Sequence, residues 1–238
     1  MLVIPAINEV NFDEVLKKIE LAANFSPWIH LDVVDGKFAK NKTWNNPSEI
    51  PNSKFQILNS KINIEVHLMV ENPEAVIKDW VSAGAKRIIV SLEAIEKSKI
   101  KNKISPPKAD PPQAEKIQTK NTKIEIGLAI NPETPVEKLI PFISINQPEI
   151  GINQRLIKFV LVLGVNPGLA GQKFNEKVLE KIKFLKNYYP GVIIEADGGI
   201  NLETTKLVKE AGADIIVSAS YIWGSQNPRE AYQMLMAM

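Results

Sequence analysis

The chain has 238 residues, of which 45% are hydrophobic and 24% are charged, and its formal net charge is +2. This composition is typical of a folded soluble protein, and the length fits one or two domains. The absence of cysteine excludes disulfides, thiolate metal ligands and cysteine nucleophiles. No apolar run approaches the ~20 residues of a membrane span, and the first residues do not resemble a signal peptide, so we expect a cytoplasmic protein with no membrane partner.

Short runs rich in isoleucine, valine and leucine alternate with segments of helical periodicity along the chain. Helices are expected after Asn11, near 47–58, from Asn72, over 135–143, over 178–185, through 207–211 and from Asn227. The predicted strands are 2–7, 28–34, 62–70, 87–92, 123–130, 158–165, 191–197 and 214–220. Strands this apolar are typical of a parallel sheet that is buried on both faces. Eight such βα units favour an α/β fold of the closed (β/α)₈ TIM-barrel type, as a single domain over 1–238.

One segment does not fit this alternation. Residues 96–123 contain eight lysines against three acidic residues, a balance of +5 that leaves −3 for the rest of the chain. Four prolines fall in the same segment, so we expect a solvated loop or frayed helix inserted at about 96–122. Aromatic residues are absent from it, which argues against a nucleic-acid partner.

Polar side chains interrupt the predicted strands near their ends. His30 and Asp32 are two positions apart in the second strand, so they point to the same face. His67 lies near the end of the third strand, and Asp197 ends the seventh. Because barrel active sites lie at the C-terminal ends of the strands, these four residues are expected to meet at one mouth. Together they suit one divalent cation, such as zinc, iron, cobalt or manganese.

Each of these residues also has a purely structural interpretation. A lone core histidine is more often hydrogen-bonded than a metal ligand, and Asp197 would also serve as a cap for the helix that follows it. Asp35 and Gly36 are typical of a simple turn. Both histidines of the chain nevertheless fall at the predicted mouth, and this coincidence favours the metal site.

Three loops near the C-terminal half contain glycine or serine at positions suited to an anion. Residues 197–200 (DGGI) place two glycines before a helix, residues 218–220 (SAS) end the last strand, and residues 166–174 (NPGLAGQKF) follow the sixth. Barrels often bind phosphate with the loops after strands seven and eight, and a glycine-containing loop can close over a substrate. Any one loop is compatible with turn chemistry alone, whereas the three together favour a phosphate site.

With these motifs the chain resembles the ribulose-phosphate 3-epimerase family. The resemblance covers nearly the whole chain outside 96–122 and about 145–157, and it rests on IHLDVVDGKF, EVHLMVENPE, GLAINPETP, VNPGLAGQKF and EADGGI. It implies a barrel of the ribulose-phosphate-binding type and a metal-dependent isomerase of the pentose phosphate pathway. The implied substrates are phosphorylated ketopentoses, D-ribulose 5-phosphate and D-xylulose 5-phosphate, which are epimerised at C3. The family commonly forms homo-oligomers.

The resemblance also assigns roles to individual residues. The metal ligands of the family correspond to His30, Asp32, His67 and Asp197, and its acid/base carboxylates correspond to Asp32 and Asp197. Two carboxylates on opposite strands would remove a proton from one face of the reacting carbon and return one to the other, through an enediolate. The substrate and phosphate contacts of the family correspond to His67, Met69, Gly168, Leu169, Ala170, Gly171, Gly198, Gly199, Ala219 and Ser220.

Some positions depart from the family pattern. Ala6 stands in place of a serine that contacts the substrate, and Asn8 stands in place of a leucine. The other departures are Val34 and Leu163 in place of methionines, Ala170 and Ala219 in place of glycines, and Ser91 in place of a common histidine. They bear on rate, loop closure and sugar specificity. They leave the metal ligands and the acid/base pair intact.

Two other functions are compatible with the sequence. One is a 3-epimerase of another ketose phosphate, such as allulose 6-phosphate. The other is a non-catalytic phosphosugar-binding barrel, which Ala6 and Ala170 would favour and which the intact pair of Asp32 and Asp197 disfavours. Exchange of the C3 proton with solvent separates these classes, because a binding protein would catalyse none.

Overall fold

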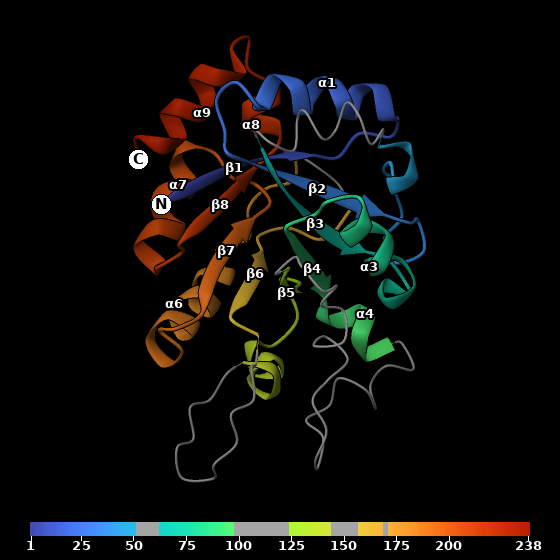
Figure 1. Ribbon diagram of the computed structural model, residues 1–238. Helices are drawn as coiled ribbons and strands as arrows, with labels where there is room; N and C mark the ends of the chain where they lie inside the picture. Colours follow the sequence, from blue (N-terminus) through green and yellow to red (C-terminus); the bar gives the residue numbers. More distant parts are fainter. Residues whose placement is uncertain (51–61, 98–123, 144–156, 169–170) are drawn as a thin grey trace.

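Eight parallel strands close into a barrel in chain order, with β8 hydrogen-bonded to β1 (Figure 1). The computed structural model describes residues 1–50, 62–97, 124–143, 157–168 and 171–238. The strands are β1 (Leu2–Ile7), β2 (Trp28–Val34), β3 (Asn63–Met69), β4 (Arg87–Ser91), β5 (Glu125–Ile130), β6 (Phe159–Leu163), β7 (Ile193–Asp197) and β8 (Ile215–Ser218). The (β/α)₈ barrel expected from the sequence is therefore confirmed.

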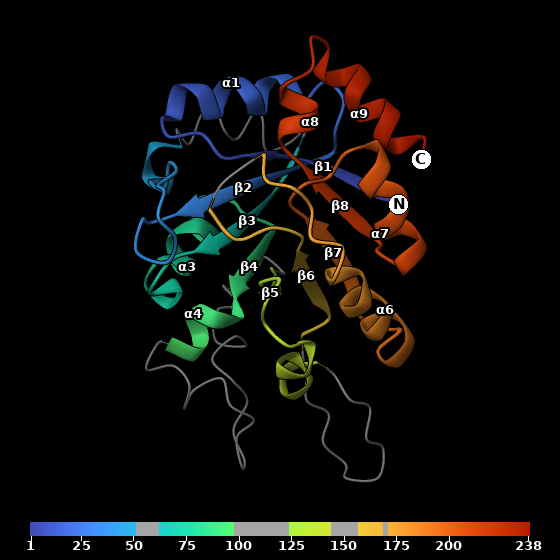
Figure 2. The same cartoon turned by 180° about the vertical axis from the view of Figure 1, so that it is seen from behind.

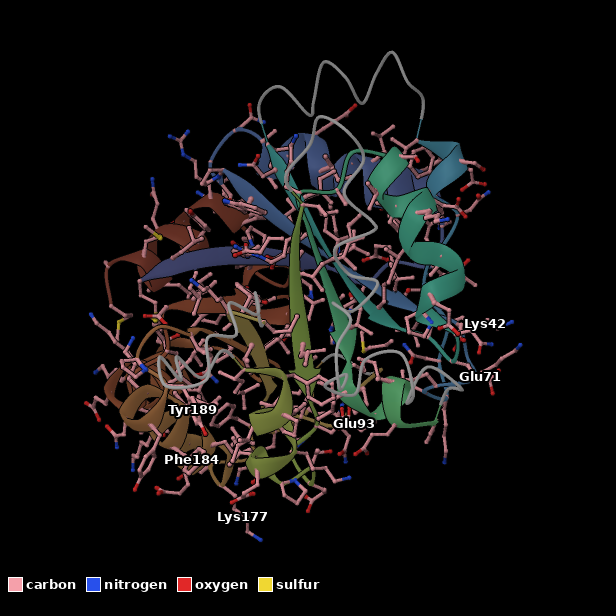
Figure 3. The ribbon with its side chains drawn as sticks, turned by 60° about the horizontal axis from the view of Figure 1, so that its bottom comes forward. Lys42, Glu71, Glu93, Lys177, Phe184 and Tyr189 are labelled. Carbon is pink, nitrogen blue, oxygen red and sulfur yellow. The ribbon has the colours of Figure 1, made fainter. Side chains whose placement is uncertain are left out.

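Helices surround the barrel on its outside (Figures 1 and 2). They are α1 (Phe12–Ala22), α3 (Pro73–Ser82), α4 (Leu92–Lys97), α6 (Val178–Tyr188), α7 (Leu202–Ala211), α8 (Ser220–Trp223) and α9 (Pro228–Met236), with 3₁₀ helices η1 (Pro47–Glu49) and η3 (Val136–Phe142). Figure 3 shows Phe184 and Tyr189 close together at α6, where their ring centroids are 6.1 Å apart. Within the described residues, no helix is both long enough and apolar enough to cross a bilayer.

The structure refines several expected boundaries. The last strand ends at Ser218, because helix α8 begins at Ser220 with a bond from the Trp223 amide to the Ala219 carbonyl. The helix expected over 135–143 is a 3₁₀ helix with Pro141 inside it, and proline has no N–H for an α-helical bond. Most of the helix expected near 47–58 lies outside the described residues, and within them 47–49 form the 3₁₀ helix η1. Most of the expected insertion lies outside them, since α4 ends at Lys97.

The strands bury two apolar layers because successive side chains point to opposite faces. The inner layer fills the barrel with side chains such as Ile4, Ile89 and Leu161. The outer layer packs the barrel against the helices and contains Trp80 of α3, which is fully buried. Burial on both faces explains why the strands read as nearly continuous apolar runs.

Charged side chains interrupt the inner layer on several strands. His30 of β2 is the register neighbour of Glu65 on β3, and Glu65 is the neighbour of Arg87 on β4. Two positions nearer the C-terminal ends of the strands, Asp32 is the neighbour of His67. The barrel therefore contains a buried charged layer and, above it, a second polar layer at the mouth.

Candidate active site

Four potential metal ligands meet at the C-terminal mouth of the barrel. His30 and Asp32 come from β2, His67 comes from β3, and Asp197 is the last residue of β7. One ligand atom from each residue lies within 4.8 Å of all the others. Strands β2 and β7 are not neighbours, so only the closed barrel brings the four together.

The contacts within this cluster suit a divalent ion. His30 Nε2 lies 3.2 Å from Asp32 Oδ1, and His67 Nδ1 lies 3.5 Å from the same oxygen. Both ring nitrogens of His67 are buried without a hydrogen-bond partner among the described residues. A buried imidazole is normally hydrogen-bonded or metal-bound, so this orphaned ring fits a metal ligand. Two imidazoles and two carboxylates are a donor set that zinc, iron, cobalt and manganese accept.

The two aspartates of the cluster differ in proton affinity. Burial raises the pKa of Asp197, and the negative charge of Asp32 raises it further, to about 7. Burial also opposes ionisation of Asp32, but the His30 ring 3.2 Å away, with its raised pKa, and the nearby His67 ring outweigh it and lower the pKa of Asp32 below its usual range. In the metal-free protein one carboxylate is therefore ionised at neutral pH, and the other is poised to carry a proton.

The pKa values of the two histidines are also shifted in opposite directions. Burial disfavours the charged form of His30, but its hydrogen bonds to Asp32 and Glu65 outweigh this effect and raise its pKa well above the usual value. Burial lowers the pKa of His67, which has Asp32 as its nearest charged neighbour. The His67 ring is consequently neutral at neutral pH, which is the form that binds metal.

A pocket opens above the cluster, and Asp32 and Asp197 both line it. His67 lies beneath this pocket as part of the cluster. Leu169 and Ala170 fall outside the described residues. The other substrate contacts implied by the family resemblance all line the pocket, namely Met69, Gly168, Gly171, Gly198, Gly199, Ala219 and Ser220.

The turn after β7 requires glycine at two positions. Gly198 and Gly199 have φ values of +94° and +71°, a region that side chains disfavour. A Cβ atom on Gly198 would meet Val165 Cγ2 at 2.5 Å, and one on Gly199 would meet Phe174 Cβ at 2.9 Å. The tight approach leaves main-chain atoms, rather than side chains, facing the pocket at this turn.

The loop after β2 contributes pocket residues that the sequence analysis did not identify. Thr43 donates to the Asp32 carbonyl at 2.6 Å and accepts from the Val34 amide at 2.9 Å, which folds the loop back onto β2. Asn41 also lines the pocket, and its Oδ1 is buried with no hydrogen-bond partner in the described part of the chain. No periodicity marks either residue, because the fold of the loop alone brings them to the mouth.

Asp35 holds that loop in place, as expected for a turn residue. Its carboxylate accepts from the amides of Lys37 and Phe38 and, across the gap to β3, from the amide of Glu71 at 2.8 Å. Lys42, which forms an isolated bridge with Asp35, and Glu71 lie near one another in Figure 3. The loops after β2 and β3 are therefore tied together at the mouth.

The buried charges Glu65, Arg87 and Glu195 were also absent from the sequence analysis. A signal for two of them was present: Glu65 stands two residues before His67, and Glu195 two before Asp197. This is the same spacing that separates His30 from Asp32, and it places each pair on one face of a strand. A charged residue two positions before a ligand therefore marks a second polar layer beneath the first.

Comparison with known proteins identifies the family of this chain. The sequence pattern of the family described as "Ribulose-phosphate 3 epimerase family" matches residues 2–223. The chain belongs to this family. The ribulose-phosphate 3-epimerase of Schizosaccharomyces pombe is 32% identical over 206 residues, covering 86% of this chain and 78% of the relative. That of Helicobacter pylori is 31% identical over 240 residues, covering 99% and 96%. As a member of this family, the protein is an epimerase, which is a kind of isomerase.

Solved structures of other proteins share the fold. Orotidine 5'-phosphate decarboxylase from Pyrococcus horikoshii OT3 aligns with a TM-score of 0.60 at 16% identity, over 98% of this chain and 97% of that one. The 3-hexulose-6-phosphate synthase from Salmonella typhimurium gives 0.62 at 13% identity, over 100% and 97%. At these identities the likeness shows the barrel and leaves the chemistry to the site itself.

Proposed function

We propose that this epimerase interconverts D-ribulose 5-phosphate and D-xylulose 5-phosphate, with Asp32 and Asp197 transferring the proton at C3. One observation carries this proposal: two carboxylates from different sides of the barrel line one pocket, and their surroundings drive their pKa values apart. A pair in which one member is ionised and the other holds a proton is the starting state that acid/base chemistry requires.

The roles of the two residues alternate with direction. When the carboxylate of Asp32 removes the C3 proton from one face, the protonated Asp197 returns a proton to the opposite face. The protonation states are then exchanged, and the reverse reaction starts from the exchanged state. A divalent ion held by His30, Asp32, His67 and Asp197 would polarise the carbonyl oxygen beside C3 and stabilise the negative charge that develops there.

The other end of the pocket is suited to the phosphate group. Gly198 and Gly199 bring the main chain close to the pocket, and Ser220 adds a hydroxyl from the adjoining β8 side. Fixing the phosphate at this end would orient C3 between the two carboxylates.

The ribulose-phosphate 3-epimerase of Oryza sativa subsp. japonica, which is 31% identical to this chain, is described as a cytoplasmic isoform, and we propose the same compartment for this enzyme. Assembly into a homo-oligomer stays a prediction.

Exchange of the C3 proton with deuterated solvent tests the mechanism. Asp197→Asn should abolish net epimerisation yet leave partial exchange from one epimer, and Asp32→Asn should leave exchange, if any, from the other. Loss of one acid/base group costs ~10² to 10⁴ in rate. Metal content is measured in parallel, because both residues are ligands as well. Asp214→Asn, which changes a carboxylate directly before β8, is the control and should keep both activities.

Two results would contradict the proposal. If metal-replete Asp32→Asn and Asp197→Asn each exchanged both epimers equally well, a two-carboxylate mechanism would be wrong. If the wild type bound the sugar phosphate but exchanged no proton, the protein would be a binding barrel. Comparing kcat/KM for ribulose 5-phosphate with that for allulose 6-phosphate assigns the sugar.

A further inference from the structure

A rung of charged side chains crosses four adjacent strands beneath the candidate metal site. His30, Glu65, Arg87 and Glu125 are successive register neighbours on β2, β3, β4 and β5. Glu65 Oε1 lies 2.7 Å from His30 Nδ1, and the other Glu65 oxygen accepts from Arg87 Nη1. Arg87 Nε donates to Glu125 Oε2 at 2.7 Å. A line of charge-assisted hydrogen bonds therefore connects the partly exposed Glu125 to His30.

The guanidinium of Arg87 is held firmly within this rung. It lies 3.9 Å from the centre of the Phe159 ring and 4.7 Å from that of Trp28, which are cation–π distances. The planar guanidinium donates hydrogen bonds to Glu65 and Glu125 at the same time. Glu65 is fully buried, so its carboxylate has a fixed position between Arg87 and His30.

We infer that Glu65 is a positioning residue for the metal ligand His30, and that Arg87 holds Glu65 in that position. A histidine that binds metal through Nε2 must carry its proton on Nδ1, and the partner of Nδ1 sets both the tautomer and the ring orientation. Glu65 occupies Nδ1, while Nε2 faces Asp32 at 3.2 Å. This inference rests on the metal site of the proposed function and adds to it the residues that orient one ligand.

Stability alone does not account for the rung. Removing charges from water costs several kcal/mol per ion, and apolar residues of similar volume often serve a core as well or better. The same inner layer is filled elsewhere by residues such as Ile89 and Leu161. The hydrogen bond to His30 gives the buried Glu65–Arg87 pair a use that aliphatic side chains would not supply.

Glu195 offers a matched comparison within the same interior. It is as buried as Glu65, but its Oε1 is 3.7 Å from His30 Nδ1 and its Oε2 is 3.9 Å from Arg87 Nη1. Neither oxygen has a hydrogen-bond partner in the part of the chain that the structure describes. His30, Glu65 and Glu195 also offer ligand atoms within 4.8 Å of one another, but both Glu65 oxygens already accept hydrogen bonds. Of these two glutamates, therefore, Glu65 is the one placed to orient His30.

Binding of Co²⁺ and Zn²⁺ to the chelator-stripped wild type, Glu65→Gln and Glu195→Gln tests this assignment. His30 and Arg87 donate to different oxygens of Glu65, and glutamine replaces one of these acceptors by an NH2 donor, so one of the two hydrogen bonds is lost. We expect Glu65→Gln to weaken metal binding by about 10- to 100-fold and to alter the visible absorption of bound Co²⁺. Glu195→Gln should bind like the wild type. Dissociation constants come from competition with a chromogenic chelator, and melting of the metal-free proteins provides a readout of structure.

The outcomes separate this inference from the proposed function. Wild-type affinity in Glu65→Gln, or an equal loss in both variants, would overturn the positioning role while leaving the metal site intact. A wild type that binds neither ion would overturn the metal site and the inference together. Should Glu65→Gln fail to fold, Glu65→Asp takes its place, because it keeps the charge for Arg87 but is one methylene too short for His30. Wild-type affinity in that variant would likewise overturn the role.

Discussion

Asn8, which by the family resemblance stands in place of a leucine, lines the pocket. Ile4 and Ala6 face the barrel interior, and Asn8 continues that alternation into the pocket. Among the described residues its side-chain amide has no hydrogen-bond partner. β1 lies between β8, which leads to the phosphate end of the pocket, and β2, which carries Asp32. If the sugar phosphate binds as proposed, the amide would lie near the sugar carbon between the phosphate and C3.

Replacing Asn8 by leucine should consequently weaken recognition of the C4 hydroxyl. One hydrogen bond is worth about 0.5–1.5 kcal/mol, so kcat/KM for ribulose 5-phosphate should fall by up to about tenfold. The matched measurement uses the 4-deoxy substrate, which should lose the same factor with the wild type but little more with Asn8→Leu. Equal losses from the 4-deoxy substrate in both proteins would rule out this contact.

Asp197 should couple metal binding to pH. Its pKa of about 7 in the metal-free protein means that it is largely protonated at pH 6, whereas a ligand must be deprotonated. Metal binding should therefore release protons, and affinity should rise as pH rises through 7, by about tenfold per pH unit for each proton displaced. Asp32, with its lowered pKa, adds nothing to this window, whereas His30, whose pKa is raised well above its usual value, releases a second proton when its Nε2 binds metal. Calorimetry in two buffers of different ionisation heat counts the protons, and identical heats would contradict the coupling.

The sequence could predict the ligands more readily than the residues that support them. His30 and Asp32 share a strand face by simple alternation, and two histidines in 238 residues made their shared position informative. The Glu65–Arg87 contact depends on the register between β3 and β4, which neither strand encodes by itself. Asn41 reaches the pocket only because its loop folds back onto β2, a path that no local pattern reveals.

The start of α7 links the stability of this helix to the glycine turn that lines the pocket. Asn201 accepts from the amides of Glu203 and Thr204 at 2.9 and 3.0 Å, and Thr204 Oγ1 accepts from the Asn201 amide. The same hydroxyl bonds the Gly199 carbonyl at 2.9 Å. The capping box therefore fixes the glycine turn as well as the helix.

Asn201→Ala should lower the free energy of unfolding by about 1 kcal/mol, because the helix loses its cap. In a protein of this size that corresponds to a fall in Tm of about 2–4 °C. KM for the sugar phosphate should rise as well, since the turn of Gly199 loosens. Asn227→Ala, which removes the cap of α9, is the control: it should cost similar stability and leave KM unchanged. An unchanged KM in Asn201→Ala would separate the cap from the pocket.

The element boundaries that departed from expectation have local causes. Pro141 inside η3 has no amide N–H. The periodicity of the sequence therefore predicted a helix correctly, but it did not reveal that this helix is of the 3₁₀ type. The run of small and β-forming residues at 214–220 hides the start of α8, because a strand and a short helix meet there without a glycine or proline to mark the change. The eight strands themselves were predictable, since burial on both faces leaves a continuous apolar run for each.

The candidate active site exists only when the barrel is closed. Its carboxylates come from β2 and β7, and its pocket includes Asn8 after the first strand and Ser220 after the last. Trp223 of α8 donates to the Ala6 carbonyl, which joins the end of the chain to its beginning. A fragment that lacks β1 with Asn8, or β8 with Ser220, therefore lacks part of the pocket lining.

Removing the metal should leave the barrel folded but less stable. The two apolar layers pack without any contribution from the ligand cluster, unlike small zinc domains that unfold without their ion. Chelator-treated protein should keep its far-UV circular dichroism and melt cooperatively. Restoring an ion at about 100 times its dissociation constant adds about 2.7 kcal/mol, or roughly 5–10 °C in Tm. A non-cooperative melt after chelation would show instead that the ion holds the fold together.

The isolation of both imidazoles at one place gives the protein an internal reporter. His30 and His67 are the only histidines in the chain, both are fully buried, and their ring centroids are 5.7 Å apart. In a sample labelled with nitrogen-15 at histidine alone, every ring signal in a nuclear magnetic resonance spectrum would originate from the floor of the active site. Tautomer, protonation and ligand exchange could thus be followed during turnover at single-residue resolution, with no background from the other 236 residues.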